Sequence, residues 1–288
     1  MTIAKLRDYI FDTLTEIGAR DAASETRIIM SEYADVQAVD LTVHGDKTAD
    51  REAVLRVGSV LERRRSREPL QYILGRWDFM GLDFELSPDT LIPRQDTEIL
   101  VETVLGDLHD GMRILDLCTG TGCILISLLK YSNDCMGVGT DISEGAIATA
   151  KVNAKRLLDD MTDVIFTVGD LYDAADGQFD IIVSNPPYIP SGVIGTLEPE
   201  VRDYEPLRAL DGGTDGLELI RRIIDGAREH LVRGGSLYIE TGYDQGAAVT
   251  GLMTDAGFIN VKVYKDYAGL DRVVSGTRPI LEGSVSAG

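Results

Sequence analysis

After Gly111 the chain alternates between short apolar runs and longer helical patterns, with glycine or aspartate turns between them. The apolar runs have the length of strands, and the segments between most of them are long enough for crossover helices. Because parallel neighbours need a helical crossover, this alternation predicts an α/β fold with a mostly parallel sheet and helices on both faces. The expected strands are 113–117, 136–140, 164–168, 180–184 and 236–240, and the expected helices lie near 123–131, 144–158, 215–231 and 244–256.

The last two apolar runs, at 261–264 and 272–277, lie too close together for a helix to separate them. Strands joined by a short connection run antiparallel. We therefore expect the sheet to end in an antiparallel hairpin, within a domain that covers residues 93–288.

The residues before this domain follow other patterns. Apolar residues recur at helical spacing up to Leu61, and Asp21 and Asp50 stand where helix N-caps are expected, which predicts a helical bundle over residues 1–70. Short aromatic and apolar stretches broken by glycines follow, which predicts a linking β-hairpin over residues 71–92.

Composition limits the partners. A formal net charge of −20 argues against stable nucleic-acid binding, because phosphates are held by clustered Lys and Arg, so a protein partner fits better. The N-terminus lacks a signal sequence and no apolar run approaches the ~18 residues of a membrane span, which predicts a cytoplasmic protein with no membrane contact. The chain has three cysteines and three histidines that lie far apart, which argues against a disulfide framework and against a metal site.

The first expected strand of the sheet leads into a glycine turn, Asp116-Leu-Cys-Thr-Gly-Thr-Gly122. Glycines let a ligand approach the backbone amides at the start of the next helix. The third glycine of the dinucleotide fingerprint is replaced by Leu125, and the carboxylate of Asp116 would repel a pyrophosphate. The turn therefore favours a cationic, amino-acid-bearing cofactor, S-adenosylmethionine. The turn residues expected to bind it are Cys118, Thr119, Gly120, Thr121 and Gly122.

Polar residues also end the next two strands. Asp141 ends the second, where a carboxylate can accept hydrogen bonds from both ribose hydroxyls. Asp170 and Leu171 end the third, where they would lie near the adenine amine and ring. Aspartate is also common in caps and turns, so each signal alone is weak. Their occurrence at successive strand ends predicts a nucleoside site.

The fourth strand ends in Asn185-Pro-Pro-Tyr188, the most specific motif of the chain. Its prolines stiffen the segment and leave carbonyls free to accept hydrogen bonds. The side-chain oxygen of Asn185 and the carbonyl of Pro186 would bind both hydrogens of a planar NH2 group, while Tyr188 packs against its flat face. Such positioning needs no strong base. We predict Asn185, Pro186 and Tyr188 as catalytic, these three with Pro187 as substrate-binding, and Asn185 as a cofactor contact too.

This motif resembles that of methyltransferases acting on adenine amines and on glutamine side chains, so it leaves the substrate open. Residues 91–98, Leu-Ile-Pro-Arg-Gln-Asp-Thr-Glu, closely resemble the signature of the release factor glutamine methyltransferases (PrmC/HemK). The resemblance continues through 68–75, 200–206 and 211–217 and covers nearly the whole chain. The ribosomal-protein glutamine methyltransferases differ from the pattern at 91–98.

The resemblance implies a Rossmann-like class I methyltransferase sheet behind a small helical domain that binds the substrate factor. It implies methyl transfer from S-adenosylmethionine to the glutamine of the Gly-Gly-Gln motif of peptide chain release factors, which modulates translation termination. The alternatives are an adenine methyltransferase of nucleic acid, a methyltransferase of a ribosomal-protein glutamine, and a non-catalytic binding module, which the intact motif disfavours.

The resemblance also bears on single residues. It implies that Arg94 contacts the cofactor, and that Arg94 and Glu98 help to close its pocket, although a structural ion pair explains them equally well. Cys118 departs from the family, which commonly has glycine there. Its small side chain should suffice, and no histidine lies near it in the sequence to make it a nucleophile.

Overall fold

The computed structural model describes residues 1–280, apart from the side chains of Ala38 and Thr42. The chain forms two compact units. One comprises Met1–Leu74 together with Glu198–Tyr204, and the other comprises Gly75–Leu197 together with the chain from Glu205 onward. The sheet and the candidate site belong entirely to the second unit.

The first unit is a helical bundle around an apolar core. Leu6, Ile10 and Leu14 of one helix are fully or almost fully buried in it. The carboxylates of Asp21 and Asp50 accept hydrogen bonds from the amides of Ser24 and Ala53, at 2.9 and 3.0 Å, so both predicted N-caps are confirmed. The helices are α1 (Ile3–Glu16), α2 (Ala22–Ala34), α3 (Ala38–His44), α4 (Arg51–Arg65), α5 (Leu70–Leu74) and α10 (Pro199–Tyr204).

Helix α10 joins this bundle from far along the chain. The buried guanidinium of Arg64 lies 2.8 Å from Glu25 and 3.4 Å from Glu200, and Arg67 lies 2.5 Å from Glu200. An arginine this buried needs such partners, because an unpaired charge in the core would be strongly destabilising. The basic residues of α4 therefore include a structural anchor for α10 and are not all solvated.

The predicted hairpin is present as β1 (Arg76–Phe79) and β2 (Leu82–Glu85), which pair antiparallel. Met80 and Gly81 form its turn, both with positive φ, as a two-residue turn of type I′ requires. Asn153 of the second unit donates to the carbonyl of Glu85 and accepts from its amide. The hairpin, which belongs to the second unit, is thus bound to the rest of that unit through its own backbone.

The sheet of the second unit has the strand order β5-β4-β3-β6-β7-β9-β8. Its pairings are parallel from β5 to β7 and antiparallel where β9 meets β7 and β8, so both the parallel sheet and the terminal hairpin are confirmed. The strands are β3 (Arg113–Leu117), β4 (Met136–Asp141), β5 (Val164–Val168), β6 (Phe179–Ser184), β7 (Leu231–Glu240), β8 (Ile259–Lys265) and β9 (Asp271–Thr277).

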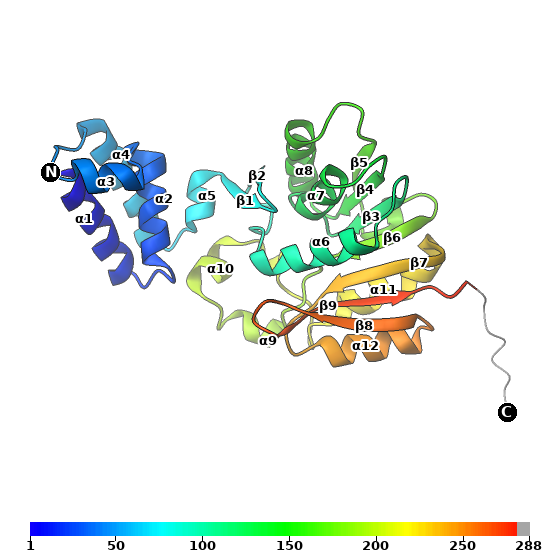
Figure 1. The fold of residues 1–288 in the computed structure, drawn as a ribbon. Helices are drawn as coiled ribbons and strands as arrows, with labels where there is room; N and C mark the ends of the chain where they lie inside the picture. The colour runs from blue at the N-terminus through cyan, green and yellow to red at the C-terminus, as the bar shows by residue number, and fades with distance from the viewer. Residues whose placement is uncertain (281–288) are drawn as a thin grey trace. The chain divides into compact units, whose positions relative to one another are not determined.

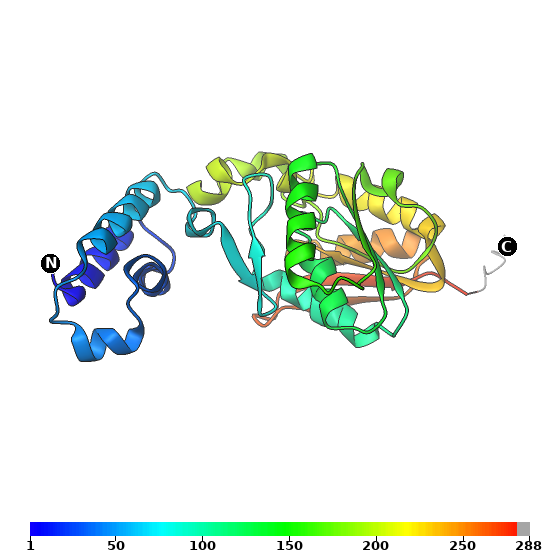
Figure 2. The same cartoon turned by 90° about the horizontal axis from the view of Figure 1, so that it is seen from above.

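Helices cover both faces of this sheet (Figures 1 and 2). On one face lie α6 (Gln95–Asp107), α7 (Cys123–Lys130) and α8 (Glu144–Leu157), and on the other lie α11 (Glu218–His230) and α12 (Gly246–Asp255). Short helical turns complete the unit: η1 (Leu171–Ala174), α9 (Ser191–Ile194) and η2 (Leu207–Ala209). Within residues 1–280, no helix is both long enough and apolar enough to cross a membrane.

Two features of this unit differ from the sequence prediction. The strand predicted to begin at 236 begins at Leu231, because the chain passes through Gly234 and Gly235 with a register shift against β6 instead of turning there. Helix α6 was not predicted. Its buried residues Thr97, Leu100, Val101 and Val104 recur at helical spacing, so the sequence does carry a helical signal there.

The direction of strand succession reverses between β3 and β6. From β3 the chain moves outward to β4 and β5, and then returns to β6 on the other side of β3. In an open α/β sheet, ligands bind beyond the carboxyl ends of the strands at such a switch point. The topology therefore predicts a ligand site formed by the residues that follow Leu117 and Ser184.

Candidate active site

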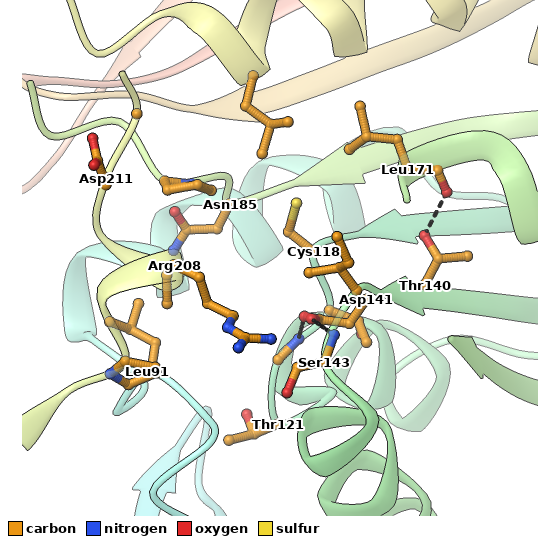
Figure 3. Close-up of a pocket in the computed structure, with 18 of the residues that line it drawn as sticks. Leu91, Cys118, Thr121, Thr140, Asp141, Ser143, Leu171, Asn185, Arg208 and Asp211 are labelled. Atoms are coloured by element: carbon orange, nitrogen blue, oxygen red, sulfur yellow. Dashed lines mark hydrogen bonds between the residues drawn. The ribbon is translucent and has the colours of Figure 1, made fainter. Parts of the chain in front are cut away.

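A cavity of about 880 Å³ lies at this switch point. Its walls come from the turns that follow β3, β4, β5 and β6, and from residues near 91 and 208 (Figure 3). The volume lies within the range typical of cofactor and small-molecule sites. Of the predicted cofactor residues, the ones that line it are Arg94, Cys118, Thr119, Gly120, Thr121, Asp141, Asp170, Leu171 and Asn185.

The turn after β3 exposes its backbone to the cavity at one glycine and is closely packed at the other. Cys118 has φ +60°, a left-handed conformation that costs a residue with a Cβ roughly 1 kcal/mol and that glycine adopts freely. A Cβ at Gly120 would meet nothing within 4 Å, so space is open above that peptide. Gly122 does not line the cavity. It has φ +79°, and an added Cβ would lie 2.9 Å from the side chain of Ile126, so glycine suits the start of α7.

Beneath this turn, Asp116 is completely buried. Its Oδ2 accepts a hydrogen bond from Thr119 Oγ1 at 2.6 Å, whereas Oδ1 has no partner among the described residues. Burial raises the pKa of Asp116 to about 7. Asp116 does not line the cavity, so its carboxylate can favour a cationic ligand above the turn only through its charge and not through a direct hydrogen bond.

Asp141 at the end of β4 accepts two backbone hydrogen bonds, from Gly120 at 3.0 Å and from Ser143 at 2.9 Å (Figure 3). Burial raises its pKa, while the two amides and the guanidinium of Arg208 oppose the rise. The carboxylate is thus oriented, and each of its oxygens retains a lone pair. Arg208, from η2, lines the cavity and was not predicted. Its neighbours in the sequence have no regular pattern that would have indicated a pocket residue.

The turn after β5 supplies Asp170 and Leu171. The carboxylate of Asp170 forms an ion pair with Arg222 at 2.8 Å, and both side chains are substantially exposed. Leu171 is buried with φ +52°, and its carbonyl accepts a hydrogen bond from Thr140 Oγ1 at 2.9 Å. An apolar side chain is therefore held firmly at this wall of the cavity, as packing against a flat ring would require.

The segment after β6 is divided between the cavity and the core. Asn185 and Pro187 line the cavity, whereas Pro186 and Tyr188 are not among its lining residues. The side-chain nitrogen of Asn185 donates a hydrogen bond to Thr97 Oγ1 at 3.1 Å. The hydroxyl of Tyr188 donates to Oε1 of Glu240 at 3.3 Å, so the tip of its side chain is bonded within the fold. The sequence did not single out Thr97 or Glu240 as site residues.

Glycines at 212 and 216 let the chain pack closely behind this segment. A Cβ at Gly216, which has φ +75°, would lie 2.3 Å from the carbonyl oxygen of Tyr188, and one at Gly212 would lie 2.8 Å from that of Pro187. The same Tyr188 carbonyl accepts a hydrogen bond from Gln245 Nε2 at 2.9 Å. The backbone of the segment is therefore closely packed at Pro187 and Tyr188 and hydrogen-bonded at Tyr188.

Arg94 and Glu98 have different partners. Arg94 lines the cavity and forms an ion pair with the buried carboxylate of Glu205, which also accepts a hydrogen bond from the amide of Ile92. Burial raises the pKa of Glu205, and Arg94 opposes the rise. Glu98 instead accepts a hydrogen bond from the amide of Met80 at 2.7 Å and does not line the cavity. Glu98 thus supports the hairpin turn, which does not fit the expectation that it closes the pocket.

Comparisons with known proteins agree with this architecture. Residues 94–194 match the family model "Methyltransferase small domain", and residues 5–75 match "PrmC N-terminal domain". A crystal structure described as a methyltransferase from Pyrococcus furiosus covers 76% of this chain and 100% of its own, with a TM-score of 0.54 and 21% identity, which supports the class I methyltransferase fold.

Curated relatives named release factor glutamine methyltransferase match nearly the whole chain. The one from Geobacter sulfurreducens is 42% identical over 276 residues, which cover 96% of each chain. The one from Agrobacterium fabrum is 39% identical over 269 residues, which cover 91% of this chain and 92% of the relative. With such identity over nearly its full length, the chain belongs to the release factor glutamine methyltransferase family.

Proposed function

We propose that this protein transfers a methyl group from S-adenosylmethionine to the side-chain amide nitrogen of the glutamine in the Gly-Gly-Gln motif of peptide chain release factors. The observation that carries the proposal is the hydrogen bond from the side-chain nitrogen of Asn185 to Thr97. Because Nδ2 is used inside the protein, the side-chain oxygen of this cavity residue is the atom left to accept a hydrogen bond from a substrate NH2 group.

The cavity residues suit S-adenosylmethionine, which supplies a methyl group activated by its sulfonium. Asp141 would accept hydrogen bonds from the ribose hydroxyls, and Asp170 and Leu171 would contact the adenine. The turn from Cys118 to Thr121, above the unpartnered oxygen of Asp116, would hold the amino-acid part. Arg94 lines the same cavity and would help to enclose the cofactor.

Catalysis would rest on positioning. Asn185 Oδ1 and the carbonyl of Pro186 would each accept one hydrogen of the glutamine NH2, which fixes the plane of the amide and directs its nitrogen towards the methyl group. The reaction forms one N–C bond, breaks one S–C bond and releases one amide proton. Well-oriented reactants gain effective molarities of about 10⁵ M or more, so these two hydrogen bonds can be sufficient for methyl transfer without a strong base.

A release factor fits this site better than a nucleic acid does. Glycines beside the target glutamine would let a narrow stretch of backbone reach the cavity. The net charge of −20 opposes a phosphate backbone. Recognition of the factor outside the Gly-Gly-Gln motif would fall to the N-terminal helical domain, residues 1–70, with residues 71–92 as the link and 93–288 as the methyltransferase domain.

Incubation with isotopically labelled cofactor tests the proposal. The substrates are a purified release factor, the same factor with the motif glutamine changed to asparagine, a ribosomal-protein preparation and double-stranded DNA. We expect label on the unmodified factor and a loss of label in the asparagine variant. Label on DNA or ribosomal protein in place of the factor would favour one of the alternative methyltransferases, and cofactor binding without transfer to any substrate would favour a binding module.

A further inference from the structure

One ion pair at the cavity wall contains a buried carboxylate. Arg94 lines the cavity with its side chain 38% exposed, whereas the side chain of Glu205 is 1% exposed and does not line the cavity. One oxygen of Glu205 accepts a hydrogen bond from Nη2 of Arg94, and the other accepts one from the amide of Ile92 at 3.3 Å. Both carboxylate oxygens are used inside the fold, so Glu205 does not bind a ligand itself.

Glu205 also joins two segments of the cavity wall. Leu91 and Arg94 belong to the first segment, and residues 206–209, which directly follow Glu205, form the second. Fastening two segments does not require a charge, because neutral hydrogen bonds and apolar packing can hold buried segments together at a lower desolvation cost. The negative charge of Glu205 is therefore not explained by its structural role alone.

Arg94 lies at the wall of the cavity that also carries Asn185. It is the N-cap residue of α6, and Thr97 in the first turn of that helix accepts the hydrogen bond from Asn185. All three residues line the cavity. A guanidinium carries a permanent positive charge, and the sulfonium of S-adenosylmethionine is a cation too. Without a counter-charge, Arg94 would therefore oppose binding of the cofactor that the cavity is proposed to hold.

We propose that Glu205 is a positioning residue that holds Arg94 at the cavity wall and offsets its charge, so that the cavity accepts a sulfonium. This inference rests on the proposed function for the identity of the cofactor. Its consequence is selectivity between cofactor and product. S-adenosylhomocysteine has the same adenine, ribose, ammonium and carboxylate groups, but a neutral thioether replaces the sulfonium. The charge of Glu205 should therefore matter for S-adenosylmethionine and much less for S-adenosylhomocysteine.

The other two arginines that line the cavity are placed differently. Arg222 pairs with Asp170 at 2.8 Å, but both side chains are substantially exposed, so water and salt screen their charges. Arg208 faces Asp141, whose pKa burial raises and the guanidinium opposes. Of the three arginines, Arg94 alone forms an ion pair with a buried carboxylate. Its pair is therefore the one in which a single substitution can create a weakly screened net charge at the wall.

The affinity quotient, which is the Kd for S-adenosylmethionine divided by the Kd for S-adenosylhomocysteine, isolates this effect. Calorimetry measures both constants, and losses that are common to the two ligands cancel in the quotient. In Glu205→Gln the charge of Arg94 is no longer offset, so we expect the quotient to rise about fivefold to tenfold, as for a partly screened charge. If Glu205 only shapes the wall, both constants should rise together. An unchanged quotient in Glu205→Gln would therefore overturn the proposal.

Variants of Arg94 show whether its charge is responsible. The double variant Arg94→Met with Glu205→Gln again has no net charge at this wall, so its affinity quotient should return to within about twofold of wild type. Arg94→Met alone removes the positive charge and should not raise the quotient, and this variant tests the proposal even if Glu205→Gln does not fold. Arg94→Lys keeps the charge beside Glu205 and should resemble wild type. A raised quotient in either variant that contains Arg94→Met would contradict the proposal.

Asp83→Asn is the matched control. Asp83 belongs to β2, does not line the cavity and lies 3.4 Å from the guanidinium of Arg156. The substitution also removes a carboxylate from an arginine ion pair in the second unit, but at an exposed site away from the cavity. Its affinity quotient should equal that of wild type. A rise as large as in Glu205→Gln would show that any lost negative charge has this effect, which would contradict a specific role of Glu205.

The same measurements separate this inference from the proposed function. If wild type binds neither ligand, the cofactor is wrong and both proposals fail. If wild type binds both and the quotient does not change in Glu205→Gln, the inference on Glu205 fails alone. If the quotient changes as expected but wild type transfers no label to the release factor, the proposed substrate fails and the role of Glu205 stands.

Discussion

Asn185 and Thr97 are 88 positions apart in the sequence and are joined by a hydrogen bond of 3.1 Å from Nδ2 to Oγ1. The bond links the end of β6 to the first turn of α6, two elements that meet at one edge of the cavity. It determines which atom of the Asn185 amide remains for a substrate. Single substitutions can therefore test the role of this amide and of the residues around it.

Removal of the Asn185 side chain should affect turnover far more than cofactor binding. By analogy with the loss of one preorganised hydrogen-bonding group in other active sites, Asn185→Ala should lower kcat roughly 10² to 10³-fold. Calorimetry should show a cofactor Kd close to that of wild type. The exposed Asn133 provides the matched control, because Asn133→Ala should leave both quantities unchanged. Near-normal turnover in Asn185→Ala would refute the role of this amide.

The glycine at 216 should be needed for the position of the catalytic segment. In Gly216→Ala, the new Cβ at φ +75° would lie 2.3 Å from the Tyr188 carbonyl, so the backbone of one segment must move. We expect a loss of roughly 1 to 3 kcal/mol in the free energy of unfolding, together with a lower kcat. Gly192→Ala is the control, since a Cβ there meets nothing within 4 Å. Equal activity and stability of the two variants would show that the close approach is unimportant.

The buried carboxyl of Glu240 should weaken the folded state as pH rises. Burial raises its folded pKa to about 7, above the ordinary glutamate value of 4.5, so its contribution to stability is full below the unfolded pKa and is lost as pH rises through about 7. Glu240→Gln lacks this loss. The unfolding free energy of Glu240→Gln minus that of wild type should therefore increase by roughly 3 kcal/mol between about pH 4 and pH 8.

Urea unfolding at several pH values measures this difference. Trp77, the single tryptophan of the chain, lies in β1 of the second unit and supplies a fluorescence signal. A difference that stays constant with pH, or that decreases as pH rises, would contradict the raised pKa.

Cys118 and Cys123 should be unreactive in the folded protein. Burial raises the pKa of Cys118, and the carboxylates of Asp141 and Asp116 raise it further; burial also raises the pKa of Cys123 to about 12. Because the thiolate is the reactive form, a disulfide reagent at about pH 8 should modify these thiols slowly in the native protein and rapidly after unfolding. Fast modification of Cys118 in the native state would reopen the question of a nucleophilic role.

The centre of the sheet could be predicted because β3 and β6 are buried on both faces. A strand in that environment is a short continuous apolar run, and the glycine turns that follow mark its end. The start of β7 was missed because Gly234 and Gly235 resemble a turn, whereas the chain continues through them beside β6. Helix α6 was overlooked although its buried residues Thr97, Leu100, Val101 and Val104 recur at helical spacing.

The candidate site was predictable where its residues follow the strands. Asp141 and Asn185 could be placed at the cavity because the carboxyl ends of parallel strands meet at one edge of the sheet. This placement does not depend on how the helices pack. Thr97, Glu205 and Glu240 could not be found in that way. Each acts through a partner more than 50 positions away, so only the folded chain shows that the two residues meet.

Mass spectrometry of a release factor co-expressed with this protein tests the proposed function most directly. Fragmentation of the peptide that contains the Gly-Gly-Gln motif should place one added methyl group on the glutamine side chain. The modification should be absent when the factor is co-expressed with Asn185→Ala. An unmodified glutamine beside active wild-type protein, or a methyl group on any other residue of the factor, would contradict the account.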